Sequence, residues 1–437
     1  MSVAVMYKGE IVFAKGFGNR NDEDPFTEET LAPIGSLTKA FTSTVLGELV
    51  AEKKMDWDKT PVSTYLREFQ LKDPFHTEQL TITDLLAHRT SMPELDDIAW
   101  FRVEGSRLDL IKRLKHLDFP TRKLQFWMNY SNFMYLVAGE VSARVSGIQY
   151  EQLVMSKILE PLGLTNTGFS PQEMAKNENH AIPYMATSYE NAKRARILAR
   201  PVDAYGLGWF MNSYEGQGPM YSHSGNIPGA CANLALFPDA DLAIASLSNV
   251  DIARLPVLLP YFFADLLDLP KSKEWLFERC EVITRMGYEY NDEFVQGYLP
   301  ERTEGKPCLH DMSELSGTFF DPVYGQISIF EKKVKDTAPD SDGADQRKEK
   351  EKEEVEEKAL FVKLRQWEGK LDHYHLNTFR TVLKDFAVVL GTLVTFETEE
   401  NGQVNTIHVQ LQKDIFKFSR KTKSKAEQKQ DAEQNTK

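Results

Sequence analysis

The sequence has 437 residues, of which 41% are hydrophobic, and it carries a formal net charge of −13 at pH 7. This length predicts two or three domains, and the hydrophobic share is enough for a sizeable core. The negative charge argues against nucleic acid as a partner, because proteins that bind nucleic acid usually present a basic surface. Much of the charge falls in residues 334–358 and in the tail after Ser419, where no packing pattern is visible.

The three cysteines, Cys231, Cys280 and Cys308, are an odd number at wide spacing. This pattern favours reduced thiols over a disulfide framework or a metal site. The first residues form a strand-like run without the basic and long apolar segments of a signal peptide. No stretch reaches about 18 uninterrupted apolar residues. We therefore expect a cytoplasmic protein that does not use a membrane as a partner.

The chain starts with a predicted β-hairpin, in which residues 3–7 and 11–14 flank Lys8-Gly9-Glu10. Ser36-Leu37-Thr38-Lys39 then opens a run to residue 50 whose apolar residues recur at helical spacing. The three-residue spacing places Ser36 and Lys39 on one helix face. An adjacent amine, together with the free N–H groups of a first helical turn, can activate a serine as a nucleophile. About one or two such matches are expected by chance in a chain of this length, so the motif needs further support.

Two further motifs follow in order. Tyr130-Ser131-Asn132 leads into an apolar, helical stretch toward Val145, and His223-Ser224-Gly225 lies in a strand-like run. A second Tyr-x-Asn at residues 189–191 lacks both the aromatic lead-in and the apolar helix, so context selects Tyr130. Serine β-lactamases and penicillin-binding proteins carry the set S-x-x-K, S-D-N and K-T-G. Here the second and third parts take the variant forms Tyr-x-Asn and His-x-Gly.

These variants resemble those of class C β-lactamases, D-aminopeptidases and related esterases. The resemblance extends over residues 5–39, 85–90, 135–164 and 205–249. The sequence is therefore similar to the β-lactamase-related serine hydrolases of the peptidase S12 kind. That resemblance implies an α+β fold over residues 1–270, with an antiparallel sheet flanked by helices and a helical subdomain.

The resemblance also implies a mechanism. Ser36 attacks a carbonyl to form an acyl-enzyme, and Lys39 and Tyr130 shuttle the proton. The backbone N–H groups of Ser36 and Asn226 hold the oxyanion. The expected reaction is cleavage of a small ester, amide or peptide.

The expected substrate-binding residues are Asn132, His223, Gly225 and Asn226. Asn132 holds Lys39 or the substrate amide. His223 stands where β-lactamases often have a lysine or arginine that binds a carboxylate. Because the charge of a histidine depends on pH, esters and small amides fit this site better than substrates that carry a carboxylate. His88, in the Leu-Leu-x-His turn after a predicted helix at residues 81–86, matches a structural histidine of the family. Relatives most often have glycine where this chain has Ser91, so a left-handed backbone there would be costlier.

Two departures from the family pattern leave other functions open. Relatives usually have a helix before the first hairpin, and they carry a long region where this chain has a short polar segment, residues 176–200. An acyltransferase would use the same residues as a hydrolase. A non-catalytic binding or assembly protein would keep the fold after losing a wall of the site. The complete set of three motifs favours an enzyme.

The rest of the chain is predicted to be rich in strands. Residues 205–210, 220–225, 232–237 and 242–247 form the antiparallel sheet, and an apolar helix at 255–267 packs back on it. Residues 271–311 are a linker. Strand-like runs at 325–330, 359–364, 373–379, 393–396 and 406–411 predict a small β-barrel over residues 312–420, which resembles the lipocalin-like tail of some relatives. A charged insertion, 334–358, interrupts this domain, and a tail, 421–437, follows it.

No metal or cofactor is expected from the sequence. His373, His375 and His408 alternate along predicted strands, and this favours packing or surface roles over a metal site. No nucleotide-binding loop is present in the sequence. The expected partner is a small-molecule substrate, and a homo-oligomer is left open.

Overall fold

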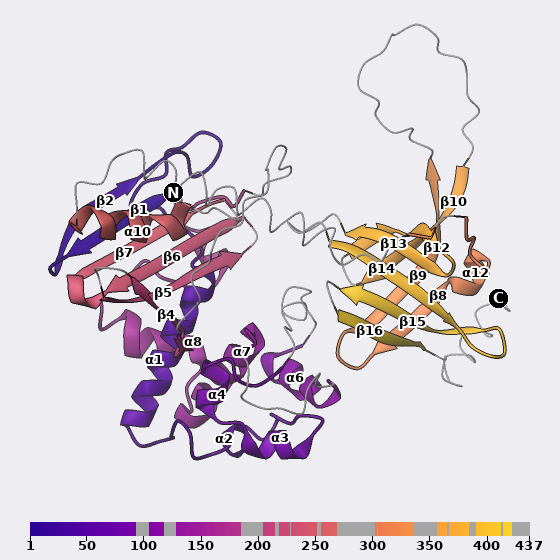
Figure 1. Cartoon of the computed structure of the whole chain (residues 1–437), viewed down its shortest axis with the longest axis horizontal. Coiled ribbons are helices and arrows are strands. Elements are labelled where there is room, and N and C mark those ends of the chain that lie inside the picture. The colour runs from indigo at the N-terminus through magenta and orange to yellow at the C-terminus, as the bar shows by residue number, and fades with distance from the viewer. Residues whose placement is uncertain are drawn as a thin grey trace, which may run out of the picture. The chain divides into compact units, whose positions relative to one another are not determined.

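A computed structural model describes residues 1–92, 105–117, 128–184, 204–214, 218–227, 229–250, 255–268, 302–303, 305–335, 356–364, 367–383, 390–411 and 414–421. The chain divides into two compact units, Met1–Asn291 and Asp292–Lys437 (Figure 1). The division falls inside the predicted linker. The predicted domain boundaries at residues 270, 311 and 420 stay predictions.

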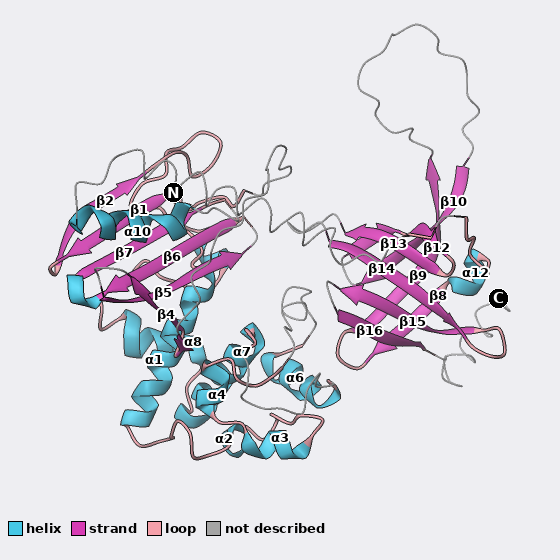
Figure 2. Ribbon diagram, viewed as in Figure 1, coloured by secondary structure: helices cyan, strands magenta, loops and turns pink. Residues whose placement is uncertain are grey.

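The N-terminal unit is built on an antiparallel sheet (Figure 2). Within the described residues it has seven strands in the order β2-β1-β7-β6-β5-β4-β3. The strands are β1 (Ser2–Tyr7), β2 (Glu10–Gly16), β3 (Ala204–Gly206), β4 (Trp209–Tyr214), β5 (Gly218–Ile227), β6 (Ala230–Phe237) and β7 (Leu242–Ser248). The first hairpin thus joins strands from the far part of the chain, because β1 pairs with β7.

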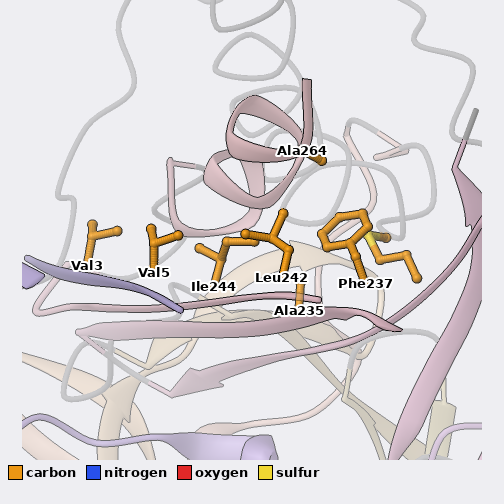
Figure 3. Close-up of a cluster of buried hydrophobic side chains, with 8 residues drawn as sticks. Val3, Val5, Ala235, Phe237, Leu242, Ile244 and Ala264 are labelled. Carbon is orange, nitrogen blue, oxygen red and sulfur yellow. The ribbon is translucent and has the colours of Figure 1, made fainter. Parts of the chain in front are cut away.

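One face of this sheet is covered by α10 (Leu255–Asp268), as predicted from the apolar run at residues 255–267. Side chains alternate between the two faces of a strand, so every second residue points to this helix. Figure 3 shows Val5, Ile244 and Phe237 standing on the face below Ala264 of α10. These side chains are 4% exposed or less. This layer also includes Met220 of β5, the strand that carries the His-x-Gly motif.

The helices of the N-terminal unit form the second part of its architecture. They are α1 (Thr38–Ala51), α2 (Val62–Tyr65), α3 (Pro74–Gln79), α4 (Ile82–Leu86), α6 (Arg107–Ile111), α7 (Asn132–Ser146), α8 (Tyr150–Val154) and α9 (Pro171–Met174). The 3-10 turns are η1 (Gly35–Leu37), η2 (Lys112–His116) and η4 (Pro238–Ala240), and η3 (Met155–Leu159) is a π-helical turn. α1 packs against α7, and Val45 of α1 and Val137 of α7 are both fully buried. The α+β class predicted from the sequence is confirmed.

The prediction of one strand over residues 205–210 is wrong. Leu207 and Gly208 have φ angles of 54° and 84°, and Gly206 pairs with Trp209. Two positive φ angles in a two-residue connection make a type I′ hairpin turn. The alternation of apolar residues continues through the turn, so the pattern did not reveal it.

The C-terminal unit is a nine-stranded antiparallel sheet within the described residues, in the order β11-β10-β9-β8-β16-β15-β14-β13-β12. Because β11 also contacts β13, the sheet nearly closes into a barrel. Phe319, Phe396 and Phe418 fill its core and are 2% exposed or less. The helix α12 (Met312–Leu315) precedes the strands β8 (Gly317–Asp321), β9 (Gly325–Lys335), β10 (Glu356–Leu364), β11 (Trp367–Lys370), β12 (Asp372–His375), β13 (Thr378–Leu383), β14 (Leu390–Thr398), β15 (Val404–Leu411) and β16 (Asp414–Arg420).

Two sequence predictions for this unit need correction. The single strand at residues 373–379 is two strands, because Leu376 adopts a φ of 47° in the turn between β12 and β13. The charged insertion is shorter than the predicted range 334–358, because residues 334–335 belong to β9 and residues 356–358 belong to β10, and these two strands pair with each other. Its remaining residues, 336–355, lie outside the described residues, as do the tail at 422–437 and most of the predicted linker.

Candidate active site

The structure places Ser36 in η1, a short 3-10 turn directly before α1, and Lys39 in the first turn of α1. The two residues therefore follow one helical path, although only Lys39 belongs to the α-helix. Lys39 Nζ donates a hydrogen bond to Ser36 Oγ at 3.0 Å. The turn is held by Gly35, which has a φ of 52°, and by Thr38 Oγ1, which donates to the Gly35 carbonyl at 2.7 Å.

The amine of Lys39 is enclosed by groups from α7 and from the segment before it. Lys39 is only 5% exposed, and its Nζ also donates a hydrogen bond to Asn132 Oδ1. Nζ lies 4.6 Å from the ring centroid of Tyr130 and 5.3 Å from that of Tyr135. Aromatic faces attract a cation at these distances. The structure thus brings Ser36, Lys39, Tyr130 and Asn132 to one place.

Strand β5 approaches the nucleophile turn so closely that Gly225 has no room for a side chain. A Cβ atom on Gly225 would lie 1.9 Å from the Ile34 carbonyl oxygen and 3.0 Å from the Ser36 nitrogen. A Cβ atom on Gly35 would lie 3.1 Å from the nitrogen of Asn226. The backbones of the Ser-x-x-Lys and His-x-Gly motifs are therefore in contact.

The turn between β3 and β4 makes a second close contact with the start of α1. A Cβ atom on Gly208 would lie 2.7 Å from the nitrogen of Ala40. The positive φ of Gly208 also favours glycine. Two glycines from the sheet thus fix the position of the helix that carries Lys39.

His223 of β5 is buried, at 2% exposed, and does not line the pocket described below. Its Nδ1 lies 2.6 Å from the Ser224 carbonyl oxygen, and its Nε2 lies 3.2 Å from the Tyr205 hydroxyl. A carbonyl can only accept, so we assign the proton to Nδ1, and Nε2 accepts from Tyr205. Burial lowers the pKa of His223 to about 4, so the ring is neutral at pH 7.

His88 holds the segment that carries Tyr130. The backbone N–H of Ser131 donates to His88 Nδ1 at 3.1 Å, and the N–H of Asn129 donates to the His88 carbonyl at 2.8 Å. The ring packs 4.3 Å from that of Tyr130. Burial, with a smaller contribution from the charge of Lys39, lowers the pKa of His88 to about 3. Ser91 adopts the left-handed conformation at a φ of 56°, although it is not glycine.

A pocket of about 430 Å³ opens at Ser36 and runs between α1 and α7. This volume is typical of sites for small ligands. The motif residues that line it are Ser36, Lys39, Asn132 and Asn226. Other lining residues were not predicted from the sequence, and they include Thr42, Arg107, Leu136, Gly139, Glu140 and Tyr150. The spacing of Leu136 and Gly139 from Asn132 along α7 would have indicated a shared helix face.

The described residues also bear on metal binding, membrane insertion and disulfides. Among them, no group of three or more histidine, cysteine or acidic side chains could hold a metal ion. None of the helices in the described ranges is long and apolar enough to cross a membrane. Neither Cys231 nor Cys308 is in a disulfide, and Cys280 lies outside these ranges.

The N-terminal unit has the β-lactamase and penicillin-binding-protein fold, and the three motifs meet in it. The family model described as Beta-lactamase matches residues 1–202 of the chain. Members of this class are serine hydrolases in general.

Comparisons with individual proteins agree with this class. The chain is 26% identical to the "Unguisins hydrolase ungD'" of Aspergillus campestris, over 75% of this chain and 74% of that protein. It is 29% identical to "Beta-lactamase-like protein 2" of Dictyostelium discoideum, over 38% of this chain but only 32% of that protein. The solved structure of the octameric penicillin-binding protein homologue from Pyrococcus abyssi has the same fold, with a TM-score of 0.54, at 17% identity over 96% of this chain and 95% of that chain.

Proposed function

We propose that this protein is a serine hydrolase that cleaves a small ester or amide through an acyl-enzyme on Ser36. The observation that carries the proposal is the 3.0 Å hydrogen bond between Lys39 Nζ and Ser36 Oγ, at the mouth of a pocket large enough for a substrate. A serine hydroxyl is a weak nucleophile unless an adjacent group takes its proton. In its neutral form, Lys39 would accept this proton across the 3.0 Å that separate Nζ from Ser36 Oγ.

In the proposed reaction, Ser36 Oγ attacks the substrate carbonyl carbon, and its proton passes to Lys39 or Tyr130. The tetrahedral intermediate collapses when the same proton is delivered to the leaving alcohol or amine. A water molecule then attacks the ester carbon, and its proton returns to Ser36 as the acid is released. The contact between Tyr130 and the Lys39 amine supports a shared role in these transfers.

The negative charge of the tetrahedral intermediate would be held by the backbone N–H groups of Ser36 and Asn226. The close approach of η1 and β5 supports this assignment. Asn132 would hold Lys39 in place through its side-chain oxygen. The neutral, buried His223 would support the fold of β5, so a substrate without a carboxylate fits the site.

The proposal is tested by labelling. A short-chain p-nitrophenyl ester or an acylating phosphonate should add one acyl or phosphonyl group per chain, measured by intact mass. Ser36→Ala should abolish the adduct, whereas Ser146→Ala, at the end of α7 and away from the pocket, should keep it. Lys39→Ala and Tyr130→Phe should slow acylation by about 10²–10⁴-fold, since both act on the proton.

Absence of the adduct from well-folded wild type, or an equal adduct on Ser36→Ala, would sink the proposal. A non-catalytic binding or assembly role would then be favoured. Product analysis with an added alcohol or amine separates hydrolysis from acyl transfer, because only the acceptor of the acyl group differs.

We also propose a cytoplasmic location and self-association. The free thiols of Cys231 and Cys308 support a reducing compartment. The Pyrococcus abyssi homologue is octameric, and this supports a test of the oligomeric state. Cell fractionation and light scattering are the measurements, and a secreted or strictly monomeric protein would contradict the respective proposal.

A further inference from the structure

The pocket extends well beyond the reacting serine. Its wall on α7 follows the residues Asn132, Leu136, Gly139 and Glu140, which lie on one helix face. Eight residues separate Asn132 from Glu140, and an α-helix rises 1.5 Å per residue, so the groove is about 12 Å long. On the facing side, α1 contributes Thr42, whose hydroxyl lies 2.7 Å from the Tyr150 hydroxyl.

The middle of the groove is largely apolar. Tyr135, Leu136 and the ring of Tyr150 supply its walls. Gly139 leaves the space open, because a Cβ atom there would lie 3.3 Å from the Tyr150 ring. An extended chain of roughly eight to ten atoms spans about 12 Å. A linear acyl chain therefore matches the length and the chemistry of the groove.

The far end of the groove is polar and is lined by Arg107 and Glu140. Arg107 pairs with Glu151 and lies 3.7 Å from Glu140, so one positive charge faces two negative ones. The separation from Glu140 is longer than a hydrogen bond. Among the described residues, no hydrogen bond holds the Glu140 carboxylate, although its side chain is only 17% exposed. This carboxylate can accept a hydrogen bond from a ligand.

We propose that this groove is an acyl-chain subsite that selects linear acyl groups ending in an ammonium group, which pairs with Glu140. The inference rests on the proposed function, because it assumes that the acyl carbonyl lies at Ser36. Attraction of an ammonium and repulsion of a carboxylate act together at a partly buried carboxylate. The two effects give a preference of roughly tenfold between acyl groups of equal length.

The test compares p-nitrophenyl esters of acetic acid, nonanoic acid, 8-aminooctanoic acid and nonanedioic acid, using the full chain. The three long acyl groups have the same length and differ in their end group. In wild type, kcat/KM for the nonanoyl ester should exceed that for the acetyl ester at least roughly tenfold, because buried methylene groups stabilise binding. The 8-aminooctanoyl ester should exceed the nonanedioyl ester roughly tenfold.

Two variants separate length from charge. Glu140→Gln should bring the ratio of the amino ester to the carboxylate ester close to one, whereas the matched control Glu48→Gln, on α1 outside the pocket, should keep it. Leu136→Trp should lower the ratio of the nonanoyl to the acetyl ester. Wild-type ratios near one, or an unchanged charge ratio in Glu140→Gln, would overturn the subsite.

Binding to Ser36→Ala distinguishes failure of the subsite from failure of the catalytic proposal. Calorimetry should show that 8-aminooctanoic acid amide binds roughly tenfold more tightly than nonanedioic acid monoamide. Loss of the covalent adduct with this preference intact would refute the hydrolase and leave the subsite standing. A normal adduct without any preference for length or charge would refute the subsite alone.

Discussion

Replacing Gly225 by alanine tests whether the sheet sets the position of the nucleophile. The added Cβ would lie 1.9 Å from the Ile34 carbonyl oxygen. Carbon and oxygen atoms that are not bonded stay about 3.3 Å apart, so β5 and η1 must separate by about 1.4 Å. A misplacement of about 1 Å can cost roughly 10²-fold in rate. Crowding of this kind also costs about 1–3 kcal/mol of stability.

We therefore expect Gly225→Ala to slow acylation of Ser36 by about 10²-fold and to lower the melting temperature by about 2–10 °C. Stopped-flow release of p-nitrophenol and differential scanning calorimetry measure the two effects. Gly206→Ala is the matched control, because its Cβ meets nothing within 4 Å and its φ is not in the left-handed region. Wild-type acylation and melting in Gly225→Ala would refute the argument from close approach.

Two further predictions concern stability. Folding lowers the pKa of His223 to about 4, so below its ordinary pKa near 6.5 the unfolded chain binds more protons. The neutral ring stabilises the fold above pH 6.5, and about 3 kcal/mol of this stability should be lost as the pH falls toward 4. Urea titrations measure this loss, and in His223→Gln the free energy of unfolding should depend less on pH over the same range. Removal of residues 312–437 should leave a chain that unfolds cooperatively by calorimetry, because the sheet and its helices lie within Met1–Asn291; aggregation at all temperatures would contradict it.

The sequence predicted the parts of the site that depend on short spacing. Ser36 and Lys39 lie three positions apart on one helical path, and Asn132 begins a helix with a strong apolar pattern. Their convergence with His223 followed from the resemblance alone, since no local pattern links segments so far apart in the chain.

The groove and the environment of His223 could not be predicted in the same way. Arg107, Glu140 and Tyr150 meet only because α6, α7 and α8 pack together. Tyr205 of β3 donates a hydrogen bond to His223 of β5. The two residues are separated by the turn at Leu207 and Gly208, which the apolar pattern did not reveal. Patterns of period two or 3.6 carry no information on such contacts.

The contact between Gly225 and the turn of Ser36 also bears on how the protein folds. It joins segments about 190 positions apart, and contacts of such long range form slowly. Because η1 and β5 are in close contact, we expect the turn around Ser36 to take its final shape after β5 has joined the sheet. A covalent label on Ser36 would therefore count fully folded molecules, and the growth of that label after dilution from denaturant would follow the last stage of refolding.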